Sequence, residues 1–421
     1  MFYVKAALAT LAAVLLWGSV LAAGAMFGWW RQPLAAADDA DGFLAAARAL
    51  VEEHNRGQVA LVLLDNGAIS GEHYASIGAG VDRDTVFPLA SLSKWITAWG
   101  VMTLVESGSL DLDRSVADYL RRWQLPESGF DNSGVTARRL LSHTAGLTDG
   151  LGFADHRSDE AVPTLLESLR EPRASSGKPA RIAVGLEPGS EWRYSGGGYL
   201  ILELLVEDLS GEPFDAYLRR ALFAPLGMST ASYAFLGDLP GAAVSYTASG
   251  RPGPYYRYAC RAATGLSASA SDLIRFVRAQ LPQSESVASR PLRQATIDAM
   301  RVPQISVLGQ GIWGLGTILY APTPGGDHVF GHDGGNEPAI NTTVRINPDT
   351  GDAIIALVTG NSRLASTLGF HWVFWQTGLP DVFSLGSEIS RVLPVMVVGW
   401  GLILLASVVL AFRRRRARER A

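Results

Sequence analysis

The sequence is poor in cysteine and in lysine, and both shortages limit what the protein can be. Cys260 is the only cysteine among 421 residues, so no disulfide can form within the chain. The simplest role for this thiol is that of a small buried hydrophobic side chain. The only lysines are Lys5, Lys94 and Lys178, and every other basic residue is an arginine. Because arginine keeps its proton in proteins whereas a buried lysine can lose it, a lysine retained here is a candidate base.

The charged residues divide the chain into an acidic middle and basic ends. Residues 32–390 carry 27 of the 36 basic and 39 of the 40 acidic side chains. This part therefore has a net charge of −12, although the whole chain has a net charge of only −4. An acidic domain repels polyanions, which argues against nucleic acid as a partner. We expect neither a metal nor a cofactor, and the sequence does not predict the oligomeric state.

The beginning of the chain is apolar over a length that can cross a bilayer. From Ala6 to Trp30 the sequence is nearly continuously apolar and follows a short segment with Lys5, which predicts a membrane anchor within residues 1–33. A cleaved signal peptide is the alternative, because small residues occur at 21–25. The apolar run continues past that point into paired tryptophans, which are typical of a membrane interface and favour the anchor.

A second apolar run lies near the other end of the chain. Val392 to Phe412 contains no charged residue and is followed by a cluster of arginines, which marks the cytoplasmic side of a membrane span. The sequence predicts a transmembrane helix at 389–412 and a basic cytoplasmic tail at 413–421. With the N-terminus also inside, the chain would cross the cell (inner) membrane twice. The domain at 34–388 would then be exported to the periplasmic or extracellular side.

The exported part has the pattern of an α+β fold. An Ala/Asp-rich linker at 34–42 precedes an amphipathic helix near Phe43 to Asn55, and the compact strand Val59–Leu64 leads through a turn at 65–67 into a partner strand. Helices then alternate with loops from Ser91 to about Leu281. Further strands are predicted at Leu315–Tyr320, His328–His332, Thr342–Ile346 and Ala353–Thr359. We therefore expect one sheet built from both ends of the domain, with a helical block inserted between them.

Ser91 and Lys94 form a Ser-x-x-Lys motif at the start of a predicted helix. The residues with helical spacing after it are Trp95, Trp99, Met102 and Val105, and Gly108 ends the pattern. Ser91 thus lies at a helix N-terminus, where unpaired N–H groups favour developing negative charge, with Lys94 about one turn later on the same face. The alternative is an N-cap serine beside a surface lysine. A second such motif, Ser175 to Lys178, lies among turn residues without apolar periodicity and is interpreted as a loop.

Three stretches resemble one family of enzymes. They are residues 87–94 with Ser91, residues 187–199 with Tyr194, and residues 331–335 with His332. Supporting stretches occur in family order at 140–147, 225–228 and 263–272. The sequence is similar to the serine beta-lactamase-related hydrolases, which include class C beta-lactamases, D,D-peptidases, D-aminopeptidases and carboxylesterases. The resemblance covers roughly residues 40–380. It implies an antiparallel sheet flanked by helices with an inserted helical subdomain, as in beta-lactamases and penicillin-binding proteins.

The resemblance also implies a role for each motif residue. Ser91 is the expected nucleophile, and either Lys94 or Tyr194 is the expected base, because a serine hydroxyl needs an adjacent proton acceptor. His332 stands where many relatives carry a lysine, and a neutral imidazole would hold a substrate carboxylate less firmly. The N–H groups of Ser91 and Gly335 are expected to form the oxyanion hole. Gly334 is expected to let the strand pass close to the substrate.

One position departs from the family pattern. Relatives have asparagine two residues after the motif tyrosine, whereas this chain has Gly196. Because that asparagine contacts amide substrates, its loss favours an esterase over an enzyme that cleaves beta-lactams or peptides. The expected substrate is a small ester or a D-amino-acid or peptide-like compound. The alternative is an inactive descendant that binds a cell-wall fragment and signals through its membrane spans. His143 is interpreted as structural and remote from the nucleophile.

Overall fold

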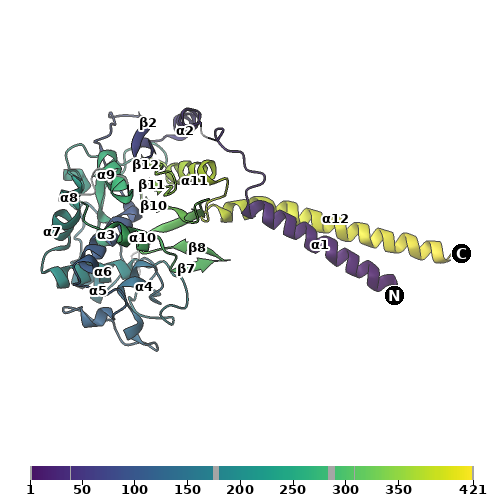
Figure 1. Ribbon diagram of the computed structural model, residues 1–421, viewed down its shortest axis with the longest axis horizontal. Helices are drawn as coiled ribbons and strands as arrows, with labels where there is room; N and C mark the ends of the chain where they lie inside the picture. Colours follow the sequence, from purple (N-terminus) through teal and green to yellow (C-terminus); the bar gives the residue numbers. More distant parts are fainter. Residues whose placement is uncertain (1, 38, 174–179, 283–289, 308, 420–421) are drawn as a thin grey trace.

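A single antiparallel sheet organises the computed structural model of the protein, which describes residues 2–37, 39–173, 180–282, 290–307 and 309–419 (Figure 1). Its eight strands lie in the order β2-β1-β12-β11-β10-β9-β8-β7, and every neighbouring pair is antiparallel. The strands are β1 (Gln58–Asp65), β2 (Ala68–Ser76), β7 (Ile305–Val307), β8 (Gln310–Trp313), β9 (Ile318–Pro322), β10 (His328–Asn336), β11 (Ile340–Ile346) and β12 (Ala353–Thr359). The prediction of one sheet built from both ends of the domain is confirmed, because β1 pairs with β12.

The strand predictions are correct where turn-forming residues mark the ends of the strands. Asn66 and Gly67 both have positive φ between β1 and β2, as a two-residue hairpin turn requires. The strand predicted at Ala353–Thr359 has those bounds in the structure. The strand predicted at Leu315–Tyr320 is wrong at its start, because the Gly314 N–H donates to the Thr317 carbonyl and closes a turn there. This turn separates β8 from β9.

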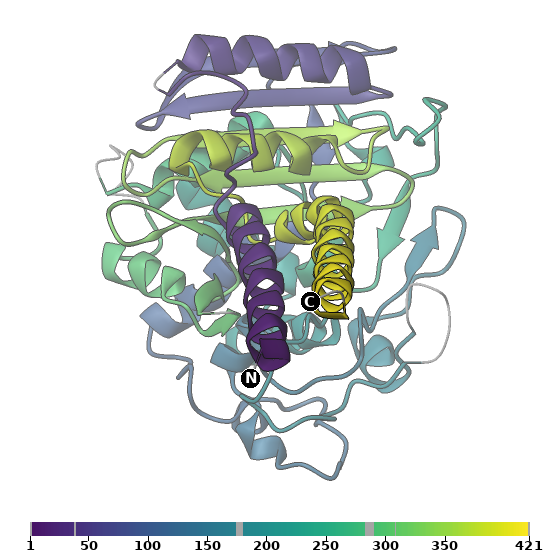
Figure 2. The same cartoon turned by 90° about the vertical axis from the view of Figure 1, so that its right-hand side faces the viewer.

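Helices cover both faces of the sheet (Figure 2), and alternate residues of β1 face different helices. In β1, Val59, Leu61 and Leu63 pack with α2 (Ala40–His54) and α11 (Leu364–Thr377). The residues between them pack against the inserted helical block on the other face. Helix α2 begins at Ala40, earlier than predicted, because the Asp39 side chain accepts a hydrogen bond from the Gly42 N–H and caps the helix.

The inserted block contains many short elements. Its longer helices are α3 (Ser93–Glu106), α6 (Gly197–Ser210), α9 (Ala270–Gln280) and α10 (Gln294–Arg301), and its shorter ones are α4 (Ala137–Leu141), α5 (Leu165–Arg170), α7 (Phe214–Leu218) and α8 (Ala224–Leu226). Two small sheets pair β3 (Val86–Pro88) with β6 (Ser267–Ser269), and β4 (Asp155–Arg157) with β5 (Tyr256–Tyr258).

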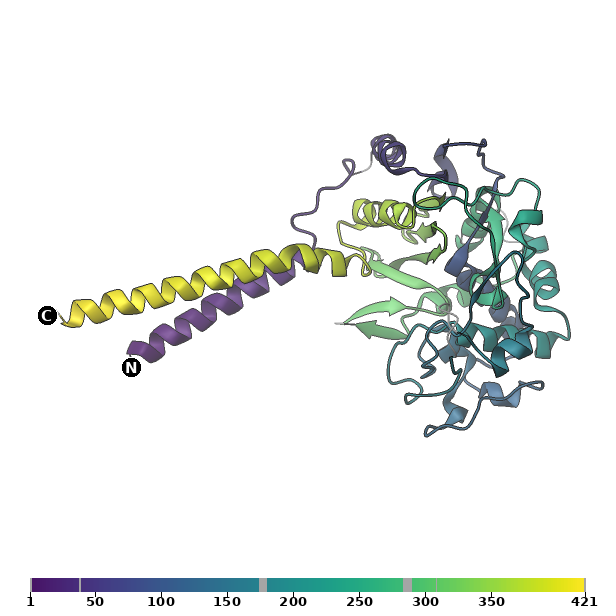
Figure 3. The ribbon, with the colours of Figure 1, turned by 180° about the vertical axis from the view of Figure 1, so that it is seen from behind.

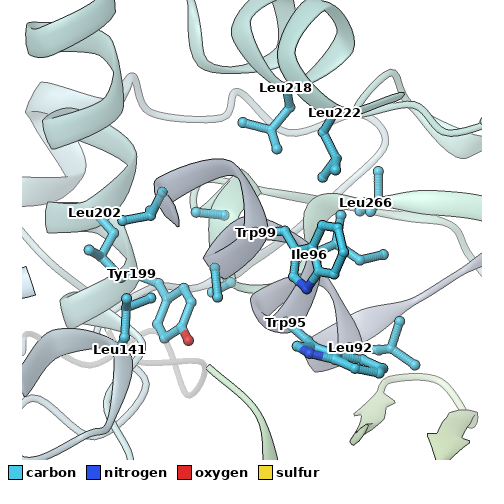
Figure 4. Packing of buried hydrophobic residues seen from close by; sticks show 14 of the residues in the cluster. Leu92, Trp95, Ile96, Trp99, Leu141, Tyr199, Leu202, Leu218, Leu222 and Leu266 are labelled. Atoms are coloured by element: carbon cyan, nitrogen blue, oxygen red, sulfur yellow. The ribbon is translucent and has the colours of Figure 1, made fainter. Parts of the chain in front are cut away.

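Helix α3 runs through the centre of this block. Its residues are apolar on nearly every side, which is the pattern of a fully buried helix. Trp95 packs edge to face against Phe276 and Phe330, with ring centroids 5.0 and 5.9 Å apart. Figure 4 shows Trp95, Ile96 and Trp99 pointing from α3 into the surrounding side chains. The start of α3, where the Ser-x-x-Lys motif lies, is therefore held on a rigid support.

The two terminal helices leave the domain side by side (Figures 1 and 3). They are α1 (Phe2–Met26) and α12 (Leu385–Glu419). Both are long and apolar enough to cross a membrane, over Val4–Met26 and Glu388–Ala417. The Trp400 indole N–H donates to the Val14 carbonyl at 3.0 Å, and the Trp17 ring fills the space beside Gly399. The helices thus form an antiparallel pair with specific contacts.

Candidate active site

Ser91 lies in the short 3₁₀ turn η1 (Ala90–Leu92) that leads directly into α3. Ala90, just before it, has φ +50, a conformation that costs energy for a residue with a side chain and often marks a functional site. The Ser93 hydroxyl holds this turn, because it donates to the Ala90 carbonyl at 2.6 Å and accepts the Leu266 N–H at 3.2 Å. Neither η1 nor α3 has a side-chain N-cap bond, so the N-cap alternative for Ser91 is wrong.

Lys94 is fully buried and points at Ser91. Its Nζ lies 3.3 Å from the Ser91 hydroxyl and donates to the Ala263 carbonyl at 2.9 Å. The same Nζ lies 4.9 Å from the Tyr194 ring centroid and 5.4 Å from that of Tyr199. No carboxylate forms an ion pair with Lys94 in the part of the chain that the structure describes. The alternative of a surface lysine is therefore wrong.

Tyr194 reaches the same place from the loop before α6, and His143 lies against it. The two ring centroids are 4.4 Å apart. The His143 Nδ1 accepts the Ser195 N–H at 3.2 Å, so the proton of the neutral ring resides on Nε2. Burial and the nearby Lys94 charge hold the pKa of His143 well below its usual range. The expectation that His143 is remote from the nucleophile is wrong, because the chain folds its loop back onto Tyr194.

Asp149 is a residue of this region that the sequence did not indicate. Its carboxylate accepts the Ser195 hydroxyl at 2.5 Å and the Gly197 N–H at 2.8 Å. It thereby satisfies the N-terminus of α6 and fixes the residue directly after Tyr194. Burial raises the pKa of Asp149, while the hydrogen bonds from Ser195 and Gly197 oppose this rise. No local pattern pairs Asp149 with a helix that begins 48 residues later.

The backbone of the loop that carries Asp149 fills the space beside Gly196. A Cβ atom added at Gly196 would overlap the Leu151 carbonyl oxygen and lie 2.5 Å from the Phe153 ring. An asparagine, as in the family pattern, therefore has no room at this position. The local packing of this chain therefore requires a glycine at position 196, in addition to the loss of the amide side chain that relatives carry there.

His332 lies on β10, buried beside the same group of aromatic rings. Its Nδ1 is 2.6 Å from the Asp333 carbonyl, which makes Nδ1 the donor and leaves Nε2 as an acceptor. Burial and the Lys94 charge lower the pKa of His332 to about 4. The ring is consequently neutral at neutral pH, as the sequence predicted for a histidine at this position. Trp313 packs edge to face against it at 5.5 Å.

The two glycines that follow His332 have different surroundings. A Cβ at Gly334 would overlap the Leu89 carbonyl and the Thr342 hydroxyl, whereas a Cβ at Gly335 would meet only the Ile340 carbonyl oxygen at 3.8 Å. Gly334 thus lets β10 approach the segment just before Ser91. It was expected to make room for a substrate, and its nearest neighbours are instead backbone and hydroxyl groups of the protein. Gly335 is exposed at the end of the strand.

A pocket of about 330 Å³ adjoins these residues but does not include Ser91. It shares the turn η6 (Arg261–Gly265) with the site, because Ala263 binds Lys94 while Thr264 and Gly265 line the pocket. Its aromatic wall consists of Tyr233, Phe235, Tyr255, Tyr256 and Tyr258. Glu337 lies at its edge, and burial together with the Glu337 charge raises the pKa of nearby Asp155 to about 6.

Two further predictions concern cysteine and the second Ser-x-x-Lys motif. Cys260 is fully buried, as expected, and burial raises its pKa well above the usual range. Ser175 and Lys178 lie outside the described residues. Among the residues with described placement, no group of His, Cys, Asp and Glu side chains could hold a metal ion.

The structure thus brings Ser91, Lys94, Tyr194 and His332 together on a support of α3, the loop before α6, and β10. Comparison with known proteins gives the family. The family model for Beta-lactamase matches residues 43–369. The chain belongs to the beta-lactamase family. Its members are serine hydrolases, and the antiparallel sheet with its helical block is the fold of beta-lactamases and penicillin-binding proteins.

The relatives of this beta-lactamase family member include a penicillin-binding protein and an esterase. Penicillin-binding protein 4 of Amycolatopsis lactamdurans is 28% identical over 348 residues, which cover 76% of this chain and 84% of that protein. Esterase EstB of Burkholderia gladioli is 30% identical over 171 residues, which cover 36% of this chain and 39% of the esterase. The octameric penicillin-binding protein homologue from Pyrococcus abyssi superimposes with a TM-score of 0.66 at 20% identity, covering 81% of this chain and 78% of that one.

Proposed function

We propose that the protein hydrolyses esters through an acyl-enzyme formed on Ser91. The observation that carries this proposal is the buried Lys94 side chain, whose Nζ lies 3.3 Å from the Ser91 hydroxyl and has no carboxylate partner among the described residues. In the first step, the Ser91 oxygen bonds to the substrate carbonyl carbon and the alcohol leaves with a proton. In the second step, water attacks the acyl group, releases the acid and restores the Ser91 hydroxyl.

Lys94 and Tyr194 are the two groups that could take the Ser91 proton and pass it to the leaving alcohol. Lys94 has the direct contact with the hydroxyl, while Tyr194 lies with its ring near the same Nζ. A proton taken by either group can be returned to the leaving group, because all three side chains share one cluster. The N–H groups of Ser91 and Gly335 are the proposed donors to the oxyanion, which is the largest contribution that such sites usually make.

The ester preference rests on His332 and on the loop at Gly196. A neutral His332 offers a substrate carboxylate no permanent positive charge, and no amide side chain fits beside Gly196. An activated ester needs neither contact, since its leaving group is good. Amide cleavage asks more, because the amine must be positioned and protonated as it leaves. The adjoining aromatic pocket is the proposed site for the acyl group, and EstB shows that this family includes esterases.

A binding module remains the second candidate. It is favoured by the similarity to a penicillin-binding protein over most of the chain and by the absence of the family asparagine. In that case the domain would bind a cell-wall fragment with little or no turnover, and the membrane helices would carry the signal. A fluorophosphonate probe and an ester assay separate the two candidates, because only the hydrolase regenerates free Ser91.

We also propose that α1 and α12 cross the cell (inner) membrane and place the domain on its outer side. Both helices have the length and composition for this, and the arginines after Phe412 would lie in the cytoplasm. A reporter that is active only in the cytoplasm should be active when fused after Ala421. Export of that reporter would contradict the two-pass arrangement.

The chemistry is tested with a panel of short-chain aryl esters, D-amino-acid amides and a cephalosporin. We expect measurable ester hydrolysis and weak or absent cephalosporin turnover. Ser91→Ala should abolish labelling and turnover, and Lys94→Arg should nearly do so, because arginine cannot give up its proton. The matched control Lys178→Arg should be close to the wild type. Faster hydrolysis of the cephalosporin than of the esters would refute the esterase proposal.

A further inference from the structure

Asp333, the residue after His332, faces the opposite side of the sheet. Neighbouring side chains in a strand alternate between the two faces, so His332 and Gly334 share one face while Asp333 lies on the face that α11 covers. There its carboxylate accepts hydrogen bonds from the Tyr320 hydroxyl at 2.9 Å and the Thr343 hydroxyl at 2.5 Å. The carbonyl of the same residue is the partner of the His332 ring. The position of Asp333 therefore sets the position of His332.

Arg345 on β11 is the charged partner of Asp333. It is fully buried, and its Nη2 donates to the Asp333 carboxylate at 2.8 Å. Its guanidinium lies between the Tyr320 and Phe370 rings, 3.9 and 4.9 Å from their centroids. A Cβ at Gly369 of α11 would lie 2.5 Å from the Arg345 Nε. The fold thus provides a close-fitting slot for one buried arginine directly behind the catalytic strand.

The second partner of Arg345 lies in the segment just before α12. Its Nη1 forms an ion pair with Asp381, whose side chain is fully buried. Asp381 also accepts the Phe383 N–H at 2.6 Å, and its carbonyl accepts the Ser384 hydroxyl at 2.8 Å. Arg31, just after α1, donates to the Ser384 hydroxyl at 3.3 Å. The chain of contacts therefore ends where both terminal helices join the domain.

We propose that Arg345 and Asp381 are positioning residues for His332, and that they couple its placement to the seating of α12. The proposal rests on the proposed function, because it assumes that His332 contacts the substrate. A shift at the start of α12 would move Asp381 and, through the ion triad of Asp381, Arg345 and Asp333, the backbone carbonyl that holds the His332 ring. Such contiguous ion pairs are a physical route by which one site can bias another.

A double-mutant cycle on the full-length protein tests this proposal. Asp381→Asn leaves Arg345 paired with Asp333 and should lower kcat/KM about tenfold, mainly through KM, for an ester that carries a hydroxyl group able to donate to the His332 Nε2. In a His332→Gln background the same substitution should change kcat/KM less than about twofold, because the group it acts through is absent. Equal effects in both backgrounds would overturn the proposal, since a general loss of stability acts regardless of His332.

Asp208→Asn is the matched control. Asp208 is a similarly buried carboxylate that pairs with Arg122 at 2.5 Å, but it lies on α6 in the helical block, where it also accepts the Arg121 N–H. Its effect on kcat/KM should be the same with His332 and with His332→Gln. If Asp381→Asn does not fold, Arg31→Gln takes its place in the cycle, and equal effects there overturn the proposal. Absence of any turnover and labelling by the wild type would instead refute the proposed function.

Discussion

The Lys94 side-chain nitrogen is surrounded by a carbonyl, a hydroxyl and two aromatic faces, and by no carboxylate in the described residues. Burying a charge at this place without an ion-pair partner would cost several kcal/mol, and cation–π contacts recover only about 0.5–2 kcal/mol. Such an arrangement persists where function needs it. The scarcity of lysine in the sequence pointed to this residue, although its burial came only from the structure.

Gly196 gives a prediction that differs from what the family pattern suggests. Restoring the family asparagine would be expected from sequence to improve amide cleavage, provided that the side chain fits. In the structure even a Cβ overlaps the Leu151 carbonyl. Gly196→Asn and Gly196→Ala should therefore both lower the melting temperature and reduce ester hydrolysis, without any gain in amide cleavage. A stable Gly196→Asn enzyme with improved amide turnover would show that the loop at 149–153 moves away.

His332 gives a prediction about stability against pH. Its pKa is about 4 in the folded protein and about 6.5 in the unfolded chain. Between these values the unfolded state binds the extra proton, so the stability contributed by neutral His332 is lost as the pH falls below about 6.5. The loss amounts to at most about 2 kcal/mol at pH 5.

The measurement is the thermal midpoint of wild type and His332→Gln at pH 7, 6 and 5. Other groups with shifted pKa values, such as His143 and Asp381, are present in both proteins and cancel in the comparison. The wild type should lose more stability than the variant on acidification. Parallel curves would mean that His332 is already protonated or is not buried.

At the scale of elements, the decisive contact is the approach of β10 to η1. Gly334 permits it, because a side chain there would overlap the Leu89 carbonyl. Gly334→Ala should therefore move the strand away from Ser91, lower activity at least about tenfold and destabilise the protein by about 1–3 kcal/mol. Gly129→Ala is the control, since an added Cβ there meets nothing within 4 Å and the residue lies outside the site. The two variants should differ clearly in ester kcat/KM and in melting temperature. Equal losses in both variants would contradict this account.

The elements that the sequence predicted are those with strong local signals. Short apolar runs bounded by turn residues predicted β1, β11 and β12, and helical spacing predicted α3. The contacts of His143 and Asp149 were not predictable, because each joins a loop to residues about 50 positions later in the chain. The burial of Arg345 was equally hidden, since an arginine within a strand is normally exposed and its partner Asp381 is 36 residues away.

At the scale of the whole molecule, the sheet explains why both terminal helices leave from one place. Because β1 and β12 are neighbours, the segments before and after them, α2 and α11, lie on the same face. The connections from these helices lead to α1 and α12 at one end of the domain (Figure 1). A chain that begins and ends at the same place can cross a membrane twice with a compact domain between, which is the arrangement we propose.

The pairing of α1 with α12 is directly testable by cross-linking. The Thr10 hydroxyl donates to the Ser407 hydroxyl at 2.8 Å, so the two side chains are in direct contact, and we expect cysteines at these positions to form a disulfide. The natural Cys260 is fully buried and should not compete. Thr10→Cys combined with Ser407→Cys should form an intramolecular disulfide under mild oxidation. After proteolysis within the domain, the two end fragments should stay joined until a reductant is added. Each single substitution provides the control, and fragments that separate without reductant would show that the helices do not pair in the membrane.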